Sequence, residues 1–227
     1  VFGDWSSDVC SSDLILKRIL KMTQMNKEIN AFIKRLQEYK TDESSCNNLY
    51  SLEDSEIQVE NLRFYLHKMY ELKPKKIIVG EAAGYKGCRL SGIPFTSETI
   101  IKEHPFFNEI SNKYLLKEKT SGEISATIVW SVLSKTNSLP LIWNIFPFHP
   151  HKKDNLKSNR TPTKDEIEIG GEILRDLASV FGIKEFFAVG KKAEERLKLL
   201  GYRPKYIRHP ANGGKNEFVE MCREFLK

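Results

Sequence analysis

The sequence predicts an α/β fold, a three-layer α/β/α sandwich with a central four-stranded parallel sheet. Short runs of β-branched and aromatic residues, bounded by Gly or Pro, have the length of buried strands. Between them lie longer segments with apolar residues at every third or fourth position, which is the spacing of amphipathic helices. Strands that alternate with helices along the chain indicate a parallel sheet with helices on both faces.

The four expected strands are short and apolar, and they occupy residues 76–79, 139–146, 185–189 and 206–208. Six helices are expected from their apolar spacing, at residues 22–39, 56–72, 123–135, 163–181, 193–200 and 216–226. The helix over 163–181 has the clearest start, because Thr163 followed by Glu166 forms a capping pattern. The polar segment 40–54 is expected to be a loop.

Composition favours a single globular domain with an anionic partner. The chain has 227 residues, of which 40% are hydrophobic and 29% charged, values typical of a globular protein. Its formal net charge of +6 favours nucleic acid ahead of a membrane surface. No run of about 18 apolar residues occurs in the sequence, so we expect no membrane span.

The four cysteines are scattered along the chain, at Cys10, Cys46, Cys88 and Cys222. They form no CxxC pair and no Cys/His spacing of a zinc site, so we expect no bound metal. Free thiols are typical of a reducing compartment. The start of the chain also lacks the basic and apolar regions of a signal peptide, and we therefore expect a cytoplasmic protein.

The first 14 residues are expected to lie outside the domain. The segment 4–14, DWSSDVCSSDL, resembles what one reading frame of a common sequencing adapter encodes. We therefore predict that residues 1–14 are foreign to the protein, the alternative being a disordered polar tail. Their removal takes away three aspartates and no Lys or Arg, which leaves residues 15–227 as one more basic domain.

The segment 80–98, GEAAGYKGCRLSGIPFTSE, directly follows the first expected strand. Loops after parallel strands lie at the carboxyl edge of the sheet, where open α/β folds bind their ligands. The turn combines glycines with the carboxylate of Glu81 and the ring of Phe95. It lacks the GxGxxG and GxxxxGK[ST] spacings, which argues against dinucleotide and P-loop sites. These features indicate a site for a flat polar ring.

Two further segments follow strands and carry polar groups. Asn144 ends an apolar strand, where its amide offers an acceptor and two donors that match the edge of a pyrimidine, although such an Asn also caps loops. His149 and His151 lack a third ligand, which makes a metal site there a weak reading. His209 stands before a proline in RHPANGG, a thin loop that alone is only a turn.

Together and in this order, the three segments resemble the motifs of the uracil-DNA glycosylase superfamily. The resemblance covers residues 62–225 and is strongest for the bacterial group with a GEAPGYxGCRxxGxPFTSE segment, which this chain matches except at Ala83. The Asn-bearing strand and a late HP[S/A] motif correspond to Asn144 and to His209-Pro210.

The resemblance implies roles for individual residues. Glu81 and His209 would be catalytic, with Glu81 activating water and His209 binding the base oxygen O2. The residues expected to bind the base, with Phe95 stacking on it and Asn144 reading its edge, are Gly80, Ala82, Tyr85, Phe95 and Asn144. The residues expected to contact DNA are Arg160, Ala211, Asn212 and Gly213. This chemistry requires no metal and no other cofactor.

The chain also departs from the family pattern in ways that bear on activity. Ala82 stands where many members have a catalytic Asp, so the base role would fall to Glu81. Gly84 stands where the most active members have a Tyr that rejects the methyl group of thymine, and Tyr85 follows as a candidate for that role. The cysteine spacing of the iron–sulfur members is missing.

The function implied by the resemblance is that of a monofunctional DNA repair glycosylase. It would flip uracil, or another deaminated base, from single- or double-stranded DNA and hydrolyse its N-glycosidic bond to leave an abasic site. We expect it to act as a monomer in the bacterial cytosol. The alternative is a member that binds nucleic acid without catalysis, and a third reading is an unrelated small-molecule α/β enzyme.

Overall fold

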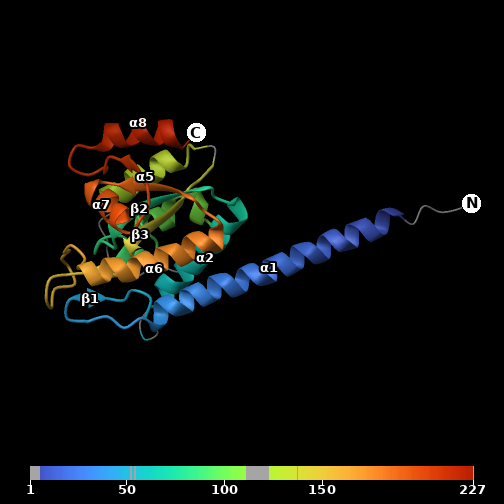
Figure 1. Ribbon diagram of the computed structural model, residues 1–227, viewed down its shortest axis with the longest axis horizontal. Helices are drawn as coiled ribbons and strands as arrows, with labels where there is room; N and C mark the ends of the chain where they lie inside the picture. The colour runs from blue at the N-terminus through green and yellow to red at the C-terminus, as the bar shows by residue number, and fades with distance from the viewer. Residues whose placement is uncertain (1–5, 52, 54, 111–122, 137, 227) are drawn as a thin grey trace, which may run out of the picture.

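A computed structural model describes residues 6–51, 53, 55–110, 123–136 and 138–226. Its centre is a four-stranded sheet of order β3-β2-β5-β6, in which every neighbouring pair is parallel. Helices flank the sheet, with α5 and α8 above it and α6 below it in Figure 1. The predicted α/β class with a central four-stranded parallel sheet is confirmed.

The four strands lie close to their predicted positions. They are β2 (Lys76–Ala82), β3 (Leu141–Phe146), β5 (Glu185–Val189) and β6 (Lys205–Ile207). β2 continues beyond its expected end because Gly80 pairs with Asn144 and Ala82 with Phe146. The start of the glycine-rich segment is therefore part of the sheet, which holds its backbone against β3.

The longer helices are also close to prediction. They are α2 (Glu56–Leu72), α5 (Ile124–Leu133), α6 (Lys164–Phe181), α7 (Lys191–Leu199) and α8 (Lys215–Phe225). α6 begins with the predicted capping box, in which Thr163 and Glu166 satisfy each other's backbone N–H groups. Gly170 lets α6 approach β3 closely, because a Cβ at this position would collide with the carbonyl oxygen of Ile145. This contact holds the backbone of Ile145, the residue that follows Asn144, against α6.

Several short elements are absent from the sequence-based prediction. They are α3 (Cys88–Ser91), α4 (Glu98–Glu103), the 3-10 helix η1 (Pro105–Phe107), and the antiparallel pair β1 (Cys46–Asn47) and β4 (His149–Pro150). Elements this short do not complete one hydrophobic period, so the pattern of apolar residues does not reveal them. α3 and α4 fold the segment between Gly80 and the end of the glycine-rich motif into a compact turn.

Helix α1 (Ser6–Glu38) is much longer than the expected helix and projects from the body of the protein (Figure 1). Its C-terminal half packs on α2 and α6 through buried residues such as Ile29 and Leu36. Residues 6–14 are part of this helix, and the assignment of residues 1–14 to an adapter or a tail outside the domain stays a prediction. Leu14, in the projecting part, is 71% exposed.

Three of the four cysteines lie among the described side chains. Cys46, Cys88 and Cys222 are buried free thiols, and Cys10 lies outside the described side chains. Among the described residues, no helix is both long and apolar enough to cross a bilayer.

Candidate active site

A cavity of about 590 Å³ lies at the carboxyl edge of the sheet, between the ends of β2, β3 and β5 and the segment after β6. Most of the residues predicted for the site line it, namely Gly80, Glu81, Ala82, Phe95, Asn144, Arg160, His209 and Asn212. Tyr85, Ala211 and Gly213 do not line it. Side chains from segments that lie more than one hundred residues apart thus meet at one place.

The Phe95 ring and the Asn144 amide both approach the backbone of Gly80 closely. A Cβ built on Gly80 would lie 2.6 Å from Cζ of Phe95 and 2.6 Å from Oδ1 of Asn144. Real side chains do not tolerate such distances, so only glycine permits this convergence. Phe95 itself has a left-handed backbone, with φ of 50°. Strained backbone of this kind in a non-glycine residue is frequent at ligand sites.

Asn144 presents its side-chain amide to the cavity. The residue is 3% exposed and occupies β3 directly beside Gly80 of β2. Within the described part of the chain, no hydrogen bond to this amide is found, although buried amides are normally paired. An amide that is buried, held on β3 and without a hydrogen bond to any described residue is suited to reading the polar edge of a ligand.

His209 is held as a neutral imidazole with its donor on Nε2. The backbone N–H of Ala211 donates to Nδ1 of His209 at 3.1 Å, so Nδ1 is the acceptor and Nε2 carries the proton. Burial lowers the pKa of His209 below its ordinary value of 6.5, and the neighbouring Arg208 lowers it further. Near neutral pH, His209 is therefore a hydrogen-bond donor without a full charge.

The two carboxylate oxygens of Glu81 have different surroundings. Lys192, from the first turn of α7, approaches Oε2 at 3.7 Å and also donates to Oγ1 of Thr161 at 2.8 Å. Oε1 is buried and has no hydrogen-bond partner in the described structure. Burial raises the pKa of Glu81 above its ordinary value of 4.5, although Lys192 and Arg196 act in the opposite direction. The raised pKa suits a carboxylate that accepts a proton.

The turn after β2 is anchored by the segment that follows β3. The carbonyl oxygen of Ala83 lies 2.8 Å from Nδ1 of His149, and the N–H of Tyr85 donates to Oδ1 of Asn159 at 3.1 Å. Nε2 of His149 lies 3.1 Å from a second carbonyl oxygen, that of Leu156. His149 therefore has a structural role, and in the described residues no group of three or more potential metal ligands is found.

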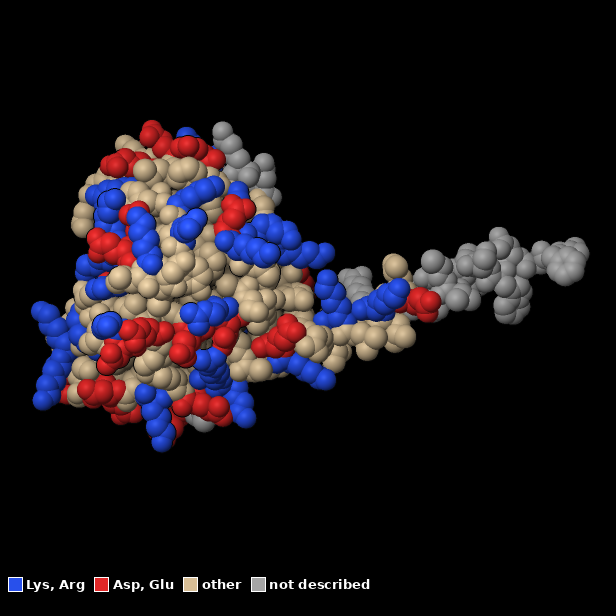
Figure 2. Space-filling view, in the orientation of Figure 1, with Lys and Arg blue, Asp and Glu red and all other residues tan. Residues whose placement is uncertain are grey.

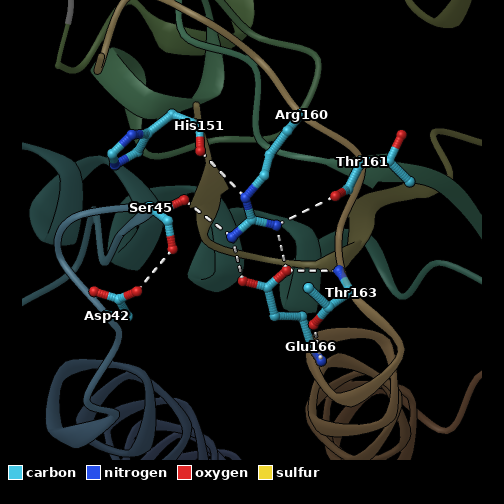
Figure 3. A network of polar contacts seen from close by, with 7 residues as sticks. All are labelled: Asp42, Ser45, His151, Arg160, Thr161, Thr163 and Glu166. Carbon is cyan, nitrogen blue, oxygen red and sulfur yellow. Dashed lines mark hydrogen bonds and ion pairs between the residues drawn. The ribbon is translucent and has the colours of Figure 1, made fainter. Parts of the chain in front are cut away.

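Arg160 lies at the edge of the cavity but uses all its donors within the protein (Figure 3). Its guanidinium makes two hydrogen bonds of 2.7 Å to the Glu166 carboxylate. The other three N–H groups donate to the carbonyl oxygens of Ser45, His151 and Thr161. This network joins the loop before β1, the segment after β4 and the start of α6. The contact of Arg160 with DNA stays a prediction, to which this geometry adds a structural role.

We expect Arg160→Ala to lower the free energy of unfolding by about 2 kcal/mol, because several charge-assisted hydrogen bonds are lost at a side chain that is only 22% exposed. Chemical denaturation checks this value. The control is Lys164→Ala, whose side chain is 88% exposed, and we expect a change within about 0.5 kcal/mol. Equal effects of the two substitutions would contradict the structural role of Arg160.

The loop after His209 is thin and exposed. Asn212 and Gly213 both have left-handed backbone, with φ of 53° and 78°. Gly214 packs so closely on the loop that a Cβ there would collide with the carbonyl oxygen of His209. The tight return of the chain brings the Ala211 N–H to His209 and leaves Asn212 and Gly213 exposed at the rim of the site.

Basic side chains surround the opening of the cavity. Lys191, Lys192 and Arg208 all line it, and Lys191 also lies 4.3 Å from the centre of the Tyr206 ring. On the face seen in Figure 2, Lys and Arg side chains occur in several groups with Asp and Glu between them. The positive charge that faces the cavity is thus local, and it suits an anionic group held at the rim.

Several residues of the cavity were missed by sequence reasoning, among them Glu123, Lys191, Lys192 and Arg208. Glu123, immediately before α5, lines the cavity beside Gly84 and Cys88. Burial raises its pKa above the ordinary 4.5. In the sequence it is one acid among many near a helix start, where acidic residues are common, so no signal distinguishes it.

Comparison with known proteins gives a result only at the level of structure. No sequence-family model matches the chain, and no curated protein matches its sequence significantly. Among solved structures, the crystal structure of wild-type SMUG2 from Pedobacter heparinus is similar, with a TM-score of 0.63 and 17% sequence identity. The match covers 86% of this chain and 94% of that chain. The chain therefore shares the fold of that structure over nearly its full length.

Proposed function

We propose that the protein is a monofunctional DNA glycosylase of the uracil-DNA glycosylase superfamily, which hydrolyses the N-glycosidic bond of uracil or another deaminated base. The convergence of Phe95 and Asn144 at Gly80 carries this proposal. The likeness in fold to the SMUG2 structure supports the superfamily, while the bacterial GEAPG-type group rests on the sequence of the turn after β2.

The cavity fits a base that has left the DNA stack. A base cannot react inside the duplex, so it must rotate out into such a pocket. Stacking on Phe95 contributes about 1–3 kcal/mol, and it favours any flat base. The Asn144 amide supplies selectivity, because its oxygen and its N–H₂ match the N3–H and O4 of uracil. Lys191 and Arg208 at the rim suit the phosphates on either side of the flipped nucleotide.

In the proposed reaction, negative charge develops on the base and positive charge develops on the sugar. When the C1′–N1 bond breaks, its electron pair goes to the base, and negative charge grows on O2. Nε2–H of His209 donates to that oxygen and stabilises the charge. The sugar becomes positively charged, and the Glu81 carboxylate stabilises it. A water molecule that donates to the Glu81 carboxylate then bonds to C1′, its proton passes to Glu81, and the base leaves as an anion that solvent protonates.

The second candidate is a protein of the same fold that binds nucleic acid without catalysis. The specific observation in its favour is Ala82, which stands where many members of the superfamily have a catalytic Asp. Such a protein would bind DNA with a steep dependence on salt and leave no abasic sites.

The test is incubation of the purified protein with oligonucleotides that contain uracil, hypoxanthine or xanthine, followed by chemical cleavage at abasic sites. We expect abasic sites in at least one of the three strands without any added cofactor. Salt-dependent binding with all three strands left intact would favour the second candidate.

We expect the excision rate to be constant from neutral to mildly alkaline pH and to fall on the acid side. Glu81 acts only when ionised, and its raised pKa places the loss of activity above pH 4.5. His209 has a lowered pKa and stays neutral down to below pH 6.5. Single-turnover rates across the pH range check this profile. A rate that increases toward pH 5 would contradict the role of Glu81 as an ionised base.

A further inference from the structure

The proposed function leaves one charged group of the cavity without a role, the carboxylate of Glu123. It lies against the turn that follows β2. A Cβ built on Gly87 would collide with its Oε2, and one on Gly84 would lie 3.9 Å from its Oε1. Gly87 leaves space for this carboxylate in its present position, and Gly84 opens the cavity beside it.

The position of Glu123 follows from the path of α5. This helix leads back to the start of β3, so the residue before it lies at the carboxyl edge of the sheet, where β3 holds Asn144. His209 follows β6, on the other side of β2 in the sheet order. The cavity is thus lined by His209, by Asn144 and, at the turn after β2, by Glu123 next to Gly84.

With O2 at His209, and with N3–H and O4 at Asn144, the next atom of the uracil ring is C5. Gly84 stands where the most active members of the resembled superfamily have the Tyr that rejects the methyl group of thymine. The proposed binding mode therefore directs C5 toward the turn at Gly84 and toward the Glu123 carboxylate beside it. Uracil and thymine differ only at C5, where thymine carries a methyl group.

We propose that Glu123 is a specificity-determining residue that excludes thymine from the cavity, an inference that rests on the proposed function. A methyl group on C5 would press against the carboxylate and remove water from it without offering a hydrogen bond, which is costly. Burial already raises the pKa of Glu123 above its ordinary value, so removal of the water that remains in the cavity would destabilise the charged form further. The side chain of Tyr85, the candidate from the sequence, does not line the cavity.

Substitution of Glu123 should leave the fold intact. Its side chain makes no capping hydrogen bond to α5. Within the described residues, it also forms no ion pair. Glu123→Leu supplies an apolar side chain of similar length, and Glu123→Gln keeps a polar one. Glu103→Leu is the matched control, because this Glu is exposed at the end of α4, away from the cavity.

The experiment compares single-turnover excision of uracil and of thymine, each placed opposite guanine, by the wild-type protein and the three variants. We expect Glu123→Leu to raise the ratio of thymine to uracil excision by at least about tenfold, the scale of discrimination that one methyl group gives. Glu123→Gln should change the ratio less, and Glu103→Leu should not change it.

The outcomes separate this inference from the proposed function. If the wild-type protein excises uracil and Glu123→Leu leaves the ratio unchanged, the inference is wrong and the proposed function stands. If the wild-type protein excises no base at all, the proposed function fails. In that case, NMR titration of the wild-type protein and of Glu123→Leu with free uracil and free thymine tests whether Glu123 excludes thymine. The inference is supported if the wild-type protein binds free uracil more tightly than free thymine and Glu123→Leu removes this difference. It is overturned if the wild-type protein binds the two bases equally or binds neither.

Discussion

His209→Ala is expected to lower the single-turnover rate of uracil excision by about 10²–10³-fold, the loss typical of removing one hydrogen-bond donor from a developing oxyanion. Nε2–H is the neutral donor of the cavity, and the Ala211 N–H fixes this tautomer. The rate of abasic-site formation under enzyme excess measures the effect directly. Because His209 donates mainly to the charge that develops during bond breaking, affinity for the DNA should change far less than the rate.

His209→Gln is the comparison, since a Gln amide retains an N–H donor at a similar distance from the backbone. We expect it to retain more activity than His209→Ala. Thermal unfolding of both variants confirms that the fold is retained. A His209→Ala variant with a rate within about threefold of wild type would show that the base leaves without help from this residue.

Gly80→Ala is expected to lower the rate by about 10²-fold, because a displacement of 1 Å at a catalytic site has effects of this size. The added methyl would lie 2.6 Å from both the Phe95 ring and the Asn144 amide, so one of the two groups must move. The same rate measurement applies, and a crystal structure of the variant would show which group has moved.

Gly84→Ala provides the steric comparison for Gly80→Ala. Its nearest neighbour would be the Glu123 carboxylate at 3.9 Å, an ordinary contact, and its φ lies outside the left-handed range. The loss of rate from Gly84→Ala should be the smaller of the two. Equal losses would mean that the close approach of Phe95 and Asn144 to Gly80 has no special importance.

Strands and long helices are predictable from this sequence because each has an unambiguous local pattern. β5 (Glu185–Val189) and α2 (Glu56–Leu72) coincide with their predicted ranges. The long α1 is not predictable from its start, because residues 6–14 carry no helical apolar stripe. The β1–β4 pair depends on contacts between residues one hundred positions apart, for which a single sequence gives no signal.

The site was only partly predictable, because some of its contacts also join residues that lie far apart in the sequence. Glu81, Phe95, Asn144 and His209 stand out because each lies near or after the end of a strand and matches a motif, and the fold brings all four to one cavity. The partners that define their chemistry come from elsewhere. Lys192 approaches Glu81 from α7, and nothing in the sequence links the two residues.

Two residues have surroundings that a family pattern does not describe. The side chain of Tyr85, a candidate for excluding thymine, lies outside the cavity lining, while the acid at position 123 faces the space beside Gly84. The contact of Arg160 with DNA stays a prediction, and the structure adds that all its donors bind protein oxygens. Orientation of a long or aromatic side chain depends on tertiary neighbours, and a linear motif does not encode them.

The most direct test of the central claim is the detection of the reaction products. The wild-type protein is incubated with a uracil-containing oligonucleotide in the presence of a metal chelator, and both products are analysed by mass spectrometry. The proposed function predicts free uracil together with a strand of unchanged length that carries an abasic site. An intact uracil-containing strand with no free base, at saturating protein, would contradict it.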